Sequence, residues 1–257
     1  MRPPHDDEQD SPNHFPIKPS SYLGMSATQL LESFGSGKHI PGSGAAAALS
    51  GLLACKLVVT VATITLRKNE YSEVHAQMRY IRNEIEQTHY PALREAFERD
   101  CDVFNQVIVA RQKRDKAKEE SNRQAANKYQ RKERKLLKEA TDIPIKIGEE
   151  CLQVSDYAMS VFDSGFSAVR GDSGAAGSIS IAGASTSVFV AYLNLQRFRG
   201  SEWAQEAERI TNNLRKRIEE AQFELFARVA DLRGKDDDVD TSQLTLDFDI
   251  PDSNEDS

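Results

Sequence analysis

Two stretches of small and apolar residues dominate the hydropathy pattern of this chain. Residues 45–66 and 174–195 consist largely of Ala, Gly, Ser, Thr and aliphatic residues, and Lys56 is the only charged residue in either. Neither stretch has the polar face of a solvated helix, whereas small residues allow helices to pack closely. We predict two buried helices rather than membrane spans, because a Lys near the centre of a span costs about 3 kcal/mol. A Lys on a buried helix must be paired or reach water, and we expect an ion pair at an interface.

The rest of the chain carries apolar residues at helical spacing. We expect further helices over residues 26–34, 71–111, 145–162 and 202–232. Pro91 predicts a bend or a new helix start, and Ile143-Pro144 predicts a break, since proline lacks the N–H that a helix interior uses. Residues 57–65 are β-branched enough for a strand when taken alone, but their length and helical neighbours argue against one. The predicted fold class is all-α, a helical bundle with two buried small-residue helices.

Composition divides the chain into three parts. Residues 1–20 hold five prolines among polar residues, which predicts a disordered N-terminal lead. Residues 235–257 hold nine acidic residues and one Lys, a net charge of −8, which predicts an acidic disordered tail. Because the whole chain carries −7, the remaining residues sum to +1. One helical domain is expected over residues 21–234.

The number and spacing of the cysteines limit the redox and metal chemistry that is expected of this chain. Cys55, Cys101 and Cys151 are odd in number and lie about fifty residues apart, without a Cys-x-x-Cys pair or a Cys/His ligand spacing. We therefore expect reduced thiols and no metal site. The N-terminus lacks the apolar region of a secretion signal, so we expect a cytoplasmic protein.

A Gly-rich turn leads directly into the first small-residue stretch. Its residues are Pro41, Gly42, Ser43 and Gly44, and free backbone N–H groups at the following helix start would suit an anionic ligand. The alternative is a tight turn that only lets two helices pack. His39 beside the turn is either a proton shuttle or a solvated side chain.

Two acidic residues are candidates for chemistry. Asp100 lies between Phe97 and Phe104 on a largely apolar helix face, where a carboxyl with a raised pKa can act as general acid or base. Its alternative role is a solvated partner of Arg99. Asp172 precedes the expected start of the second small-residue helix, so it either caps that helix or contacts substrate.

Four elements of the chain resemble, in order, motifs of the formiminotransferase-cyclodeaminase C-terminal domain, a family that includes stand-alone methenyltetrahydrofolate cyclohydrolases. Residues 41–48 (Pro-Gly-Ser-Gly-Ala-Ala-Ala-Ala) resemble its Pro-Gly-Gly-Gly-Ser-x-Ala-Ala signature. Residues 100–107 (Asp-Cys-Asp-Val-Phe-Asn-Gln-Val) are similar to Asp-x-x-Ala-Phe-x-x-Val. Residues 171–176 (Gly-Asp-Ser-Gly-Ala-Ala) resemble its Ser-Asp-x-Gly-x-Ala-Ala turn, and residues 193–195 (Leu-Asn-Leu) its Ile-Asn-Leu end.

The resemblance implies a fold, a substrate and a set of site residues. The subunit would be all-helical, form a homodimer through the small-residue helices and bind a tetrahydrofolate derivative near that interface, without a metal. The reaction would be that of a methenyltetrahydrofolate cyclohydrolase or a formiminotetrahydrofolate cyclodeaminase, with Asp100 as general acid/base. The implied substrate-binding residues are Pro41, Gly42, Ser43, Gly44, Asp172 and Asn194.

The chain also departs from the family pattern, which leaves alternatives open. Ser43, Ala45, Phe166, Gly171 and Val190 stand where the family usually has Gly, Ser, Asn, Ser and Asn. Several of these changes remove hydrogen-bonding side chains. The alternative is therefore a catalytically inactive helical dimer that acts as an interaction scaffold. The absence of a formiminotransferase domain favours cyclohydrolase over cyclodeaminase.

Two charged segments suggest further partners. Residues 111–139 carry twelve basic and five acidic residues and predict a long exposed helix or helical arm. It is a solvated arm, a site for the polyglutamate tail of a folate, or a nucleic-acid contact; Tyr129 is its only aromatic residue, which argues against stacking on single strands. In the tail, Gln243 to Phe248 (Gln-Leu-Thr-Leu-Asp-Phe) match the form of peptides that dock on bacterial sliding clamps, although an acidic solubilising tail is the alternative.

Overall fold

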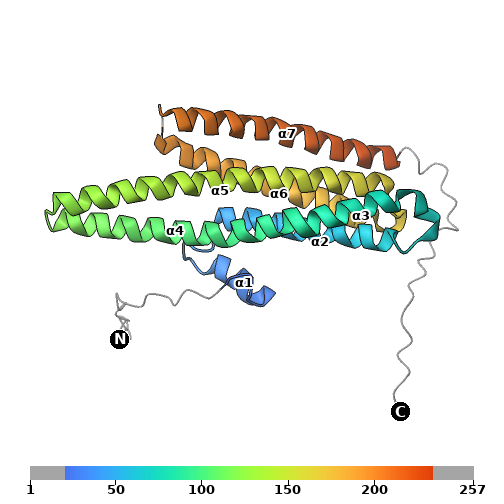
Figure 1. Cartoon of the computed structure of the whole chain (residues 1–257), viewed down its shortest axis with the longest axis horizontal. Helices are drawn as coiled ribbons and strands as arrows, with labels where there is room; N and C mark the ends of the chain where they lie inside the picture. The colour runs from blue at the N-terminus through green and yellow to red at the C-terminus, as the bar shows by residue number, and fades with distance from the viewer. Residues whose placement is uncertain (1–20, 199, 234–257) are drawn as a thin grey trace, which may run out of the picture.

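The long helices of this chain run close to one common axis in an elongated bundle (Figure 1). The computed structural model describes residues 21–198 and 200–233, so the N-terminal lead and the acidic tail with Gln243 to Phe248 lie outside the described residues. The helices are α1 (Ala27–Gly35), α2 (Ser43–Thr65), α3 (His75–Glu84), α4 (Tyr90–Glu119), α5 (Arg123–Ser164), α6 (Arg170–Leu195) and α7 (Glu202–Arg233). The described residues contain no strand, which confirms the all-α prediction.

The two small-residue helices, α2 and α6, pack against each other in opposite directions. Gly183 of α6 faces α2 so closely that a Cβ there would lie 2.9 Å from the carbonyl oxygen of Ala47. A Cβ on Gly51 of α2 would lie 2.8 Å from Sγ of Cys151 on α5. Backbones approach this closely only where side chains are small, so the small residues set the spacing of the core.

Each of these helices is buried on one face only. Leu53 of α2 is 53% exposed, and Phe189 and Leu193 of α6 are 66% and 50% exposed. By length and composition alone, Ser43–Thr65 and Ser167–Phe198 are able to cross a membrane, but half of each apolar window is already buried in the bundle. The core helices of proteins outside membranes meet the same criterion. The prediction of buried helices is therefore confirmed for their inner faces, whereas their outer faces are exposed in a single chain.

A single π-helical turn, Ile85–His89, joins α3 to α4. Nδ1 of His89 lies 2.7 Å from Oε2 of Glu150 on α5, which ties this turn to the bundle. Pro91 occupies the first turn of α4, where a missing N–H costs little. Of the two predictions for Pro91, the new helix start is the one observed.

The predicted helix break at Pro144 is wrong, because α5 runs without interruption from Arg123 to Ser164. A proline inside a helix leaves the carbonyl four residues earlier without its N–H partner, at a cost of about 3 kcal/mol. Here Nδ2 of Asn194 on α6 donates to the carbonyl oxygen of Ala140 at 2.8 Å. A side chain from a neighbouring helix thus replaces the missing donor and lets α5 continue.

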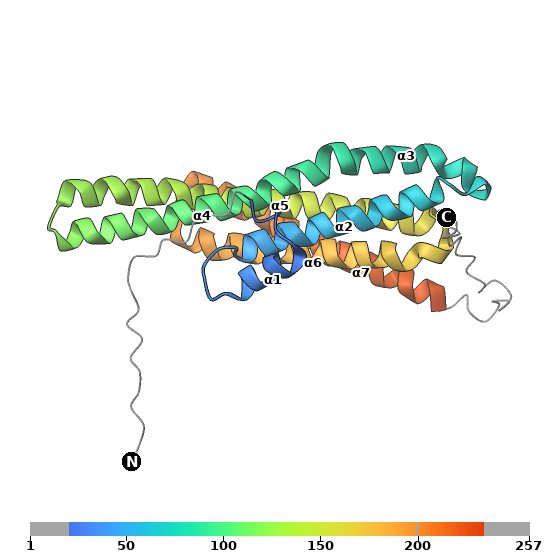
Figure 2. The ribbon, with the colours of Figure 1, turned by 90° about the horizontal axis from the view of Figure 1, so that it is seen from below.

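The predicted basic arm is a two-helix hairpin made by the end of α4 and the start of α5. A short turn at residues 120–122 separates the helices, and the Asn122 side chain accepts from the N–H of Ala125 to cap α5. The tip of the hairpin projects well past the neighbouring ends of α6 and α7 (Figures 1 and 2). The arm is therefore solvated on most of its circumference.

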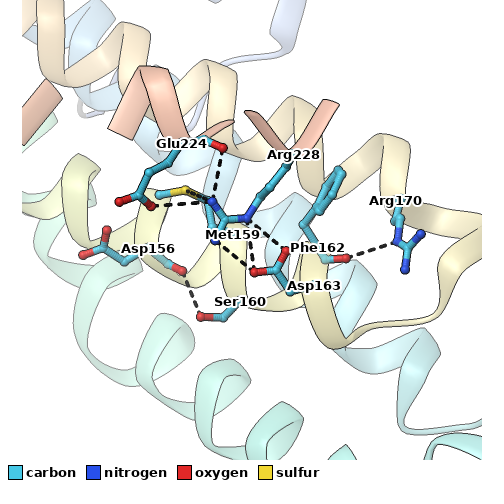
Figure 3. Close-up of polar contacts among 8 residues, drawn as sticks. All are labelled: Asp156, Met159, Ser160, Phe162, Asp163, Arg170, Glu224 and Arg228. Carbon is cyan, nitrogen blue, oxygen red and sulfur yellow. Dashed lines mark hydrogen bonds and ion pairs between the residues drawn. The ribbon is translucent and has the colours of Figure 1, made fainter. Parts of the chain in front are cut away.

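Ion pairs fasten the C-terminal half of α7 to α5 (Figure 3). The Arg228 guanidinium makes two parallel contacts to Asp163, Nε to Oδ1 and Nη2 to Oδ2, each 2.9 Å long. Nη1 of Arg228 also lies 3.4 Å from Sδ of Met159. Close by, Nε of Arg170 donates to the carbonyl oxygen of Phe162 at 3.2 Å, near the C-terminus of α5.

All three cysteines are buried free thiols. Burial raises the pKa of Cys55 to about 12, and that of Cys151 still further. Thiols with such pKa values are poor nucleophiles at neutral pH, so Cys55 and Cys151 serve as small apolar residues of the core.

Candidate active site

The Asp100 carboxylate of α4 meets the first turn of α2. The N–H of Ala45 donates to Oδ2 of Asp100 at 3.0 Å. A Cβ on Gly44 would lie 2.3 Å from Oδ1, so only glycine lets the carboxylate approach the backbone here. The structure thus brings together two elements that the sequence placed more than fifty residues apart, the Gly-rich turn and Asp100.

Burial raises the pKa of Asp100 to about 6, and the hydrogen bond from the Ala45 N–H opposes this shift. No cation is paired with this carboxylate among the described residues. Because the positive end of the α2 dipole also favours the anion, desolvation outweighs two effects that act against it. A carboxyl with a pKa near 6 exchanges its proton readily close to neutral pH, as a general acid or base must.

The segment before α1 is attached beside this carboxylate. Oε1 of Glu98 accepts from Oγ of Ser21 at 2.5 Å and from the N–H of Leu23 at 3.3 Å. Glu98 precedes Asp100 by two residues on α4, so one turn of this helix contacts both the segment before α1 and the start of α2. The sequence offers no signal for Glu98, since its partners lie more than seventy residues away.

The Gly-rich turn itself presents both buried and exposed groups. Pro41 is buried and follows a cis peptide bond with Ile40, whereas Ser43 and His39 are exposed. An open hollow of about 710 Å³ lies nearby on α1, lined among others by Ser21, Gln29 and Glu32. Asp100 does not line this hollow.

Asp172 lies at the far end of α2 from Asp100. The N–H of Phe166, just before α6, donates to Oγ1 of Thr65 at 2.9 Å, so the start of α6 is anchored to the end of α2. Gly44 and Thr65 are 21 residues apart on one helix, or about 30 Å at 1.5 Å per residue. Within one chain, Asp172 therefore does not share a pocket with Asp100.

The local role predicted for Asp172 also needs correction. The helix was expected to start at residue 174, with Asp172 as its cap, but α6 already begins at Arg170 and Val169 holds the N-cap position. Asp172 is in the first helical turn, half-buried, where a carboxylate complements the helix dipole. A 3-10 turn, Ser167–Val169, directly precedes α6, so the helix begins earlier in the sequence than expected.

Asn194 and Lys56 each have a structural partner other than Asp100. The Nδ2 group of Asn194 is occupied by the Ala140 carbonyl next to Pro144. Lys56 is exposed and places Nζ 3.8 Å from the ring centroid of Tyr90, a cation–π contact. Within one chain this contact replaces the ion pair that was expected for Lys56. The described residues contain no group of three His, Cys, Asp or Glu side chains that is able to hold a metal ion.

Comparison with known protein families shows to which family this chain belongs. Residues 26–213 match the family model described as formiminotransferase-cyclodeaminase. The chain belongs to this family. The match covers every helix from α1 to α6 and the start of α7, so it contains both Asp100 and the Gly-rich turn.

Individual members of the family support this relationship. The chain is 29% identical over 186 residues to a methenyltetrahydrofolate cyclohydrolase of Methylorubrum extorquens, an alignment that covers 71% of this chain and 86% of the relative. The fold is also that of a solved formiminotetrahydrofolate cyclodeaminase from Thermotoga maritima, with a TM-score of 0.69 and 18% sequence identity. That alignment covers 82% of this chain and 98% of the solved one. The resemblance of the four sequence motifs to this family is thereby confirmed.

Proposed function

We propose that this chain is a cytoplasmic folate-dependent enzyme that hydrolyses methenyltetrahydrofolate, with Asp100 as its general acid/base. The observation that carries the proposal is the half-buried Asp100 carboxyl against Gly44 and the Ala45 N–H, with a pKa of about 6. The cyclohydrolase of Methylorubrum extorquens, aligned over most of both chains, favours this reaction over deamination.

Proton transfer is the chemistry that Asp100 would supply. As an anion, the carboxylate accepts a proton from the water that attacks the methenyl carbon. It then returns this proton to the ring nitrogen as the carbon–nitrogen bond breaks, and the second water proton leaves to solvent as the formyl group forms. The methenyl substrate is a cation, so the ionised carboxylate also attracts the reacting carbon. The Ala45 N–H holds Oδ2 in place, which leaves Oδ1 for the reaction.

A second copy of the chain would complete the pocket. The outer face of α2 and α6 exposes the large apolar side chains of Leu53, Phe189 and Leu193, which are of the kind that self-association covers. In a twofold dimer built through this face with its axis perpendicular to the helices, the Asp172 end of one copy would approach the Asp100 end of the other. This arrangement would reconcile the separation of about 30 Å within one chain with a single folate site.

Turnover of methenyltetrahydrofolate, followed by its ultraviolet absorbance, tests the proposal. We expect the wild type to hydrolyse the substrate and Asp100→Asn to lower kcat by about 10²- to 10⁴-fold, the range for removal of a general acid/base. Asp102→Asn is the matched control, because this residue is two positions away and contacts Arg99 and Gln106. We expect its kcat to stay within about threefold of wild type.

The same assay separates the rival functions. Turnover of formiminotetrahydrofolate but not of methenyltetrahydrofolate would assign the deaminase reaction. Absence of turnover and of folate binding with both substrates would support the inactive scaffold instead. Equal losses for Asp100→Asn and Asp102→Asn would remove the special role given to Asp100.

Mixed dimers test whether two chains share a site. Asp100→Asn and Asp172→Asn are each expected to be inactive alone. Co-expression in equal amounts should restore about a quarter of the wild-type sites, because half of the dimers then contain one intact site. Activity of Asp172→Asn alone would contradict its role, and absence of recovery would place each site within one chain.

A further inference from the structure

The exposed surface of α5 on the projecting arm contains no acidic side chain between residues 128 and 138. Six basic residues are exposed there, namely Lys128, Arg131, Lys132, Arg134, Lys135 and Lys138. At 100° per residue they fall within an arc of about 160° along about 15 Å of helix. None of them makes a close ion pair among the described residues, and only Lys138 interacts with a nearby carboxylate, that of Asp142. Most of this basic face therefore carries uncompensated charge.

Burial of the one acid in this segment produces the uniform charge. The Glu133 side chain is 7% exposed and points between α4 and α5. Its Oε1 accepts from Nε of Arg111 at 2.7 Å, and its Oε2 pairs with Nη1 of Arg114. The arginines of α4 therefore neutralise this acid internally, and the sequence alone does not reveal that its charge is hidden from the surface.

Amide residues lie beside the basic face, and the carboxylate that follows Lys138, that of Glu139, is paired with Arg99. Asn127 and Gln130 are exposed on the same helix, and Gln124 lies one turn earlier. Amide and basic side chains are the groups that donate hydrogen bonds to phosphate oxygens in nucleic-acid complexes. At the base of the arm, Nζ of Lys138 lies 4.7 Å from the Trp203 ring centroid and the Arg134 guanidinium 5.9 Å from that of Phe198. These contacts hold the two cations in position.

The arm and the C-terminal end of α7 lie at the two ends of the long axis (Figure 1). The end of α7 therefore does not cover the basic face.

We propose that the basic face of α5 binds the phosphate backbone of double-stranded nucleic acid, without reading its sequence. The tip of the hairpin projects past the neighbouring ends of α6 and α7 (Figure 2), so a duplex can lie along this part of the arm. Its one aromatic residue, Tyr129, is half-buried with Nζ of Lys113 5.9 Å from its ring, and therefore offers no platform for stacking single-stranded bases. This activity is separate from the folate site and does not depend on it.

Fluorescence anisotropy of a labelled duplex of about 30 base pairs with the full chain tests this proposal across a range of salt concentrations. The test variant is Lys128→Gln/Arg131→Gln/Lys132→Gln/Lys135→Gln. We expect at least a tenfold loss of affinity at low salt. The slope of log K against log salt should fall in magnitude by about 3 to 4, because each lost phosphate contact removes about 0.9.

A control variant removes four exposed basic residues elsewhere, Arg67→Gln/Arg79→Gln/Arg94→Gln/Lys216→Gln. Its net charge equals that of the test variant, and circular dichroism checks that both remain helical. We expect affinity within about twofold of wild type and an unchanged salt slope. Equal losses in the two variants, or no duplex binding by the wild type at low salt, would overturn the proposal.

Two competitors define the ligand. A single strand of equal length should bind more weakly than the duplex, and stronger binding of the single strand would contradict the backbone geometry proposed here. A polyglutamate peptide of equal charge should displace the duplex poorly. Equal displacement would identify the basic face as a site for acidic polypeptides and overturn the assignment to nucleic acid.

Discussion

Asp100 and Glu133 are two inward-facing carboxylates at the α4–α5 region, and their surroundings are opposite. Asp100 lies in the bundle with one backbone N–H as partner, from Ala45. Glu133 lies in the arm between two guanidinium groups, those of Arg111 and Arg114. The first is left without a compensating cation, whereas the second is compensated twice.

The difference shows how burial serves two purposes in one helix pair. Without a cation, desolvation raises the pKa of Asp100 to about 6 and keeps its proton exchangeable. With two arginines, Glu133 holds the arm together and keeps its own charge away from the surface. The first arrangement prepares a reactive group, and the second stabilises the arm and leaves its outer face uniformly basic.

Removal of the Glu133 charge should have the largest effect on stability. Glu133→Gln leaves two arginines facing each other at the α4–α5 contact, and we expect the free energy of unfolding to fall by about 2 to 3 kcal/mol. Urea denaturation measures this loss. In the exposed pair of Arg99 and Glu139, Glu139→Gln should cost less than about 1 kcal/mol. Equal costs would show that burial does not distinguish the two pairs.

The next prediction concerns the pH dependence of Asp100. Its folded-state pKa, about 6, lies above the ordinary value of 3.8, so folding favours the protonated form. The charged form is therefore a stability cost that is absent at low pH and grows as pH rises through this interval. The unfolding free energy of Asp100→Asn minus that of wild type should increase by about 2 kcal/mol between pH 4 and 7.5.

Denaturant titrations of both proteins across this pH range measure that difference. Asp102→Asn provides the reference for a carboxylate on the same helix. A difference that is independent of pH, or one that decreases as pH rises, would contradict the burial of an unpaired carboxyl at Asp100.

The smallest expected effect is that of Gly44→Ala. The new Cβ overlaps Oδ1 of Asp100, so the short side chain must turn away from the Ala45 N–H. We expect a loss of about 1 kcal/mol in unfolding free energy, from overpacking partly offset by the helix preference of alanine. The lower limb of the pH–rate profile should move from about 6 towards 4, because the displaced carboxyl regains water.

Gly35→Ala is the control for this change, since a Cβ there meets no atom within 4 Å. Its stability and pH profile should match those of wild type. If the lower limb of the pH–rate profile of Gly44→Ala is unchanged, the group that titrates in that profile is not Asp100.

The helical class, the two small-residue helices and the family motifs are readable from the amino-acid sequence alone. They depend on local composition, periodicity and short motifs, which a single sequence contains. The same periodicity indicates an arm over residues 111–139, but not that it folds back at residues 120–122. Its turn lacks Gly and Pro, and Ser121 adopts a positive φ of 55° without a local sequence signal.

The predicted helix break at Pro144 was wrong for a definite physical reason. Proline removes a donor wherever it occurs, and a sequence pattern treats that loss as final. The outcome depends on Asn194, fifty residues away, whose amide supplies a donor to Ala140 only after α5 and α6 have packed. For the same reason, the family motif points to substrate binding by Asn194, whereas helix packing gives its amide a structural partner.

The sequence by itself determined which segments are helices, which helices must pack closely and which residue types are available for chemistry, because these depend on neighbours along the chain. Tertiary structure alone decided which carboxylate is left unpaired and which is neutralised. Among residues 21–198 and 200–233 it placed Ala45 but no cation beside Asp100, and it turned Glu133 inward between two arginines. A carboxylate's desolvation and charge partners come from residues distant in sequence, and both are set only when the helices pack.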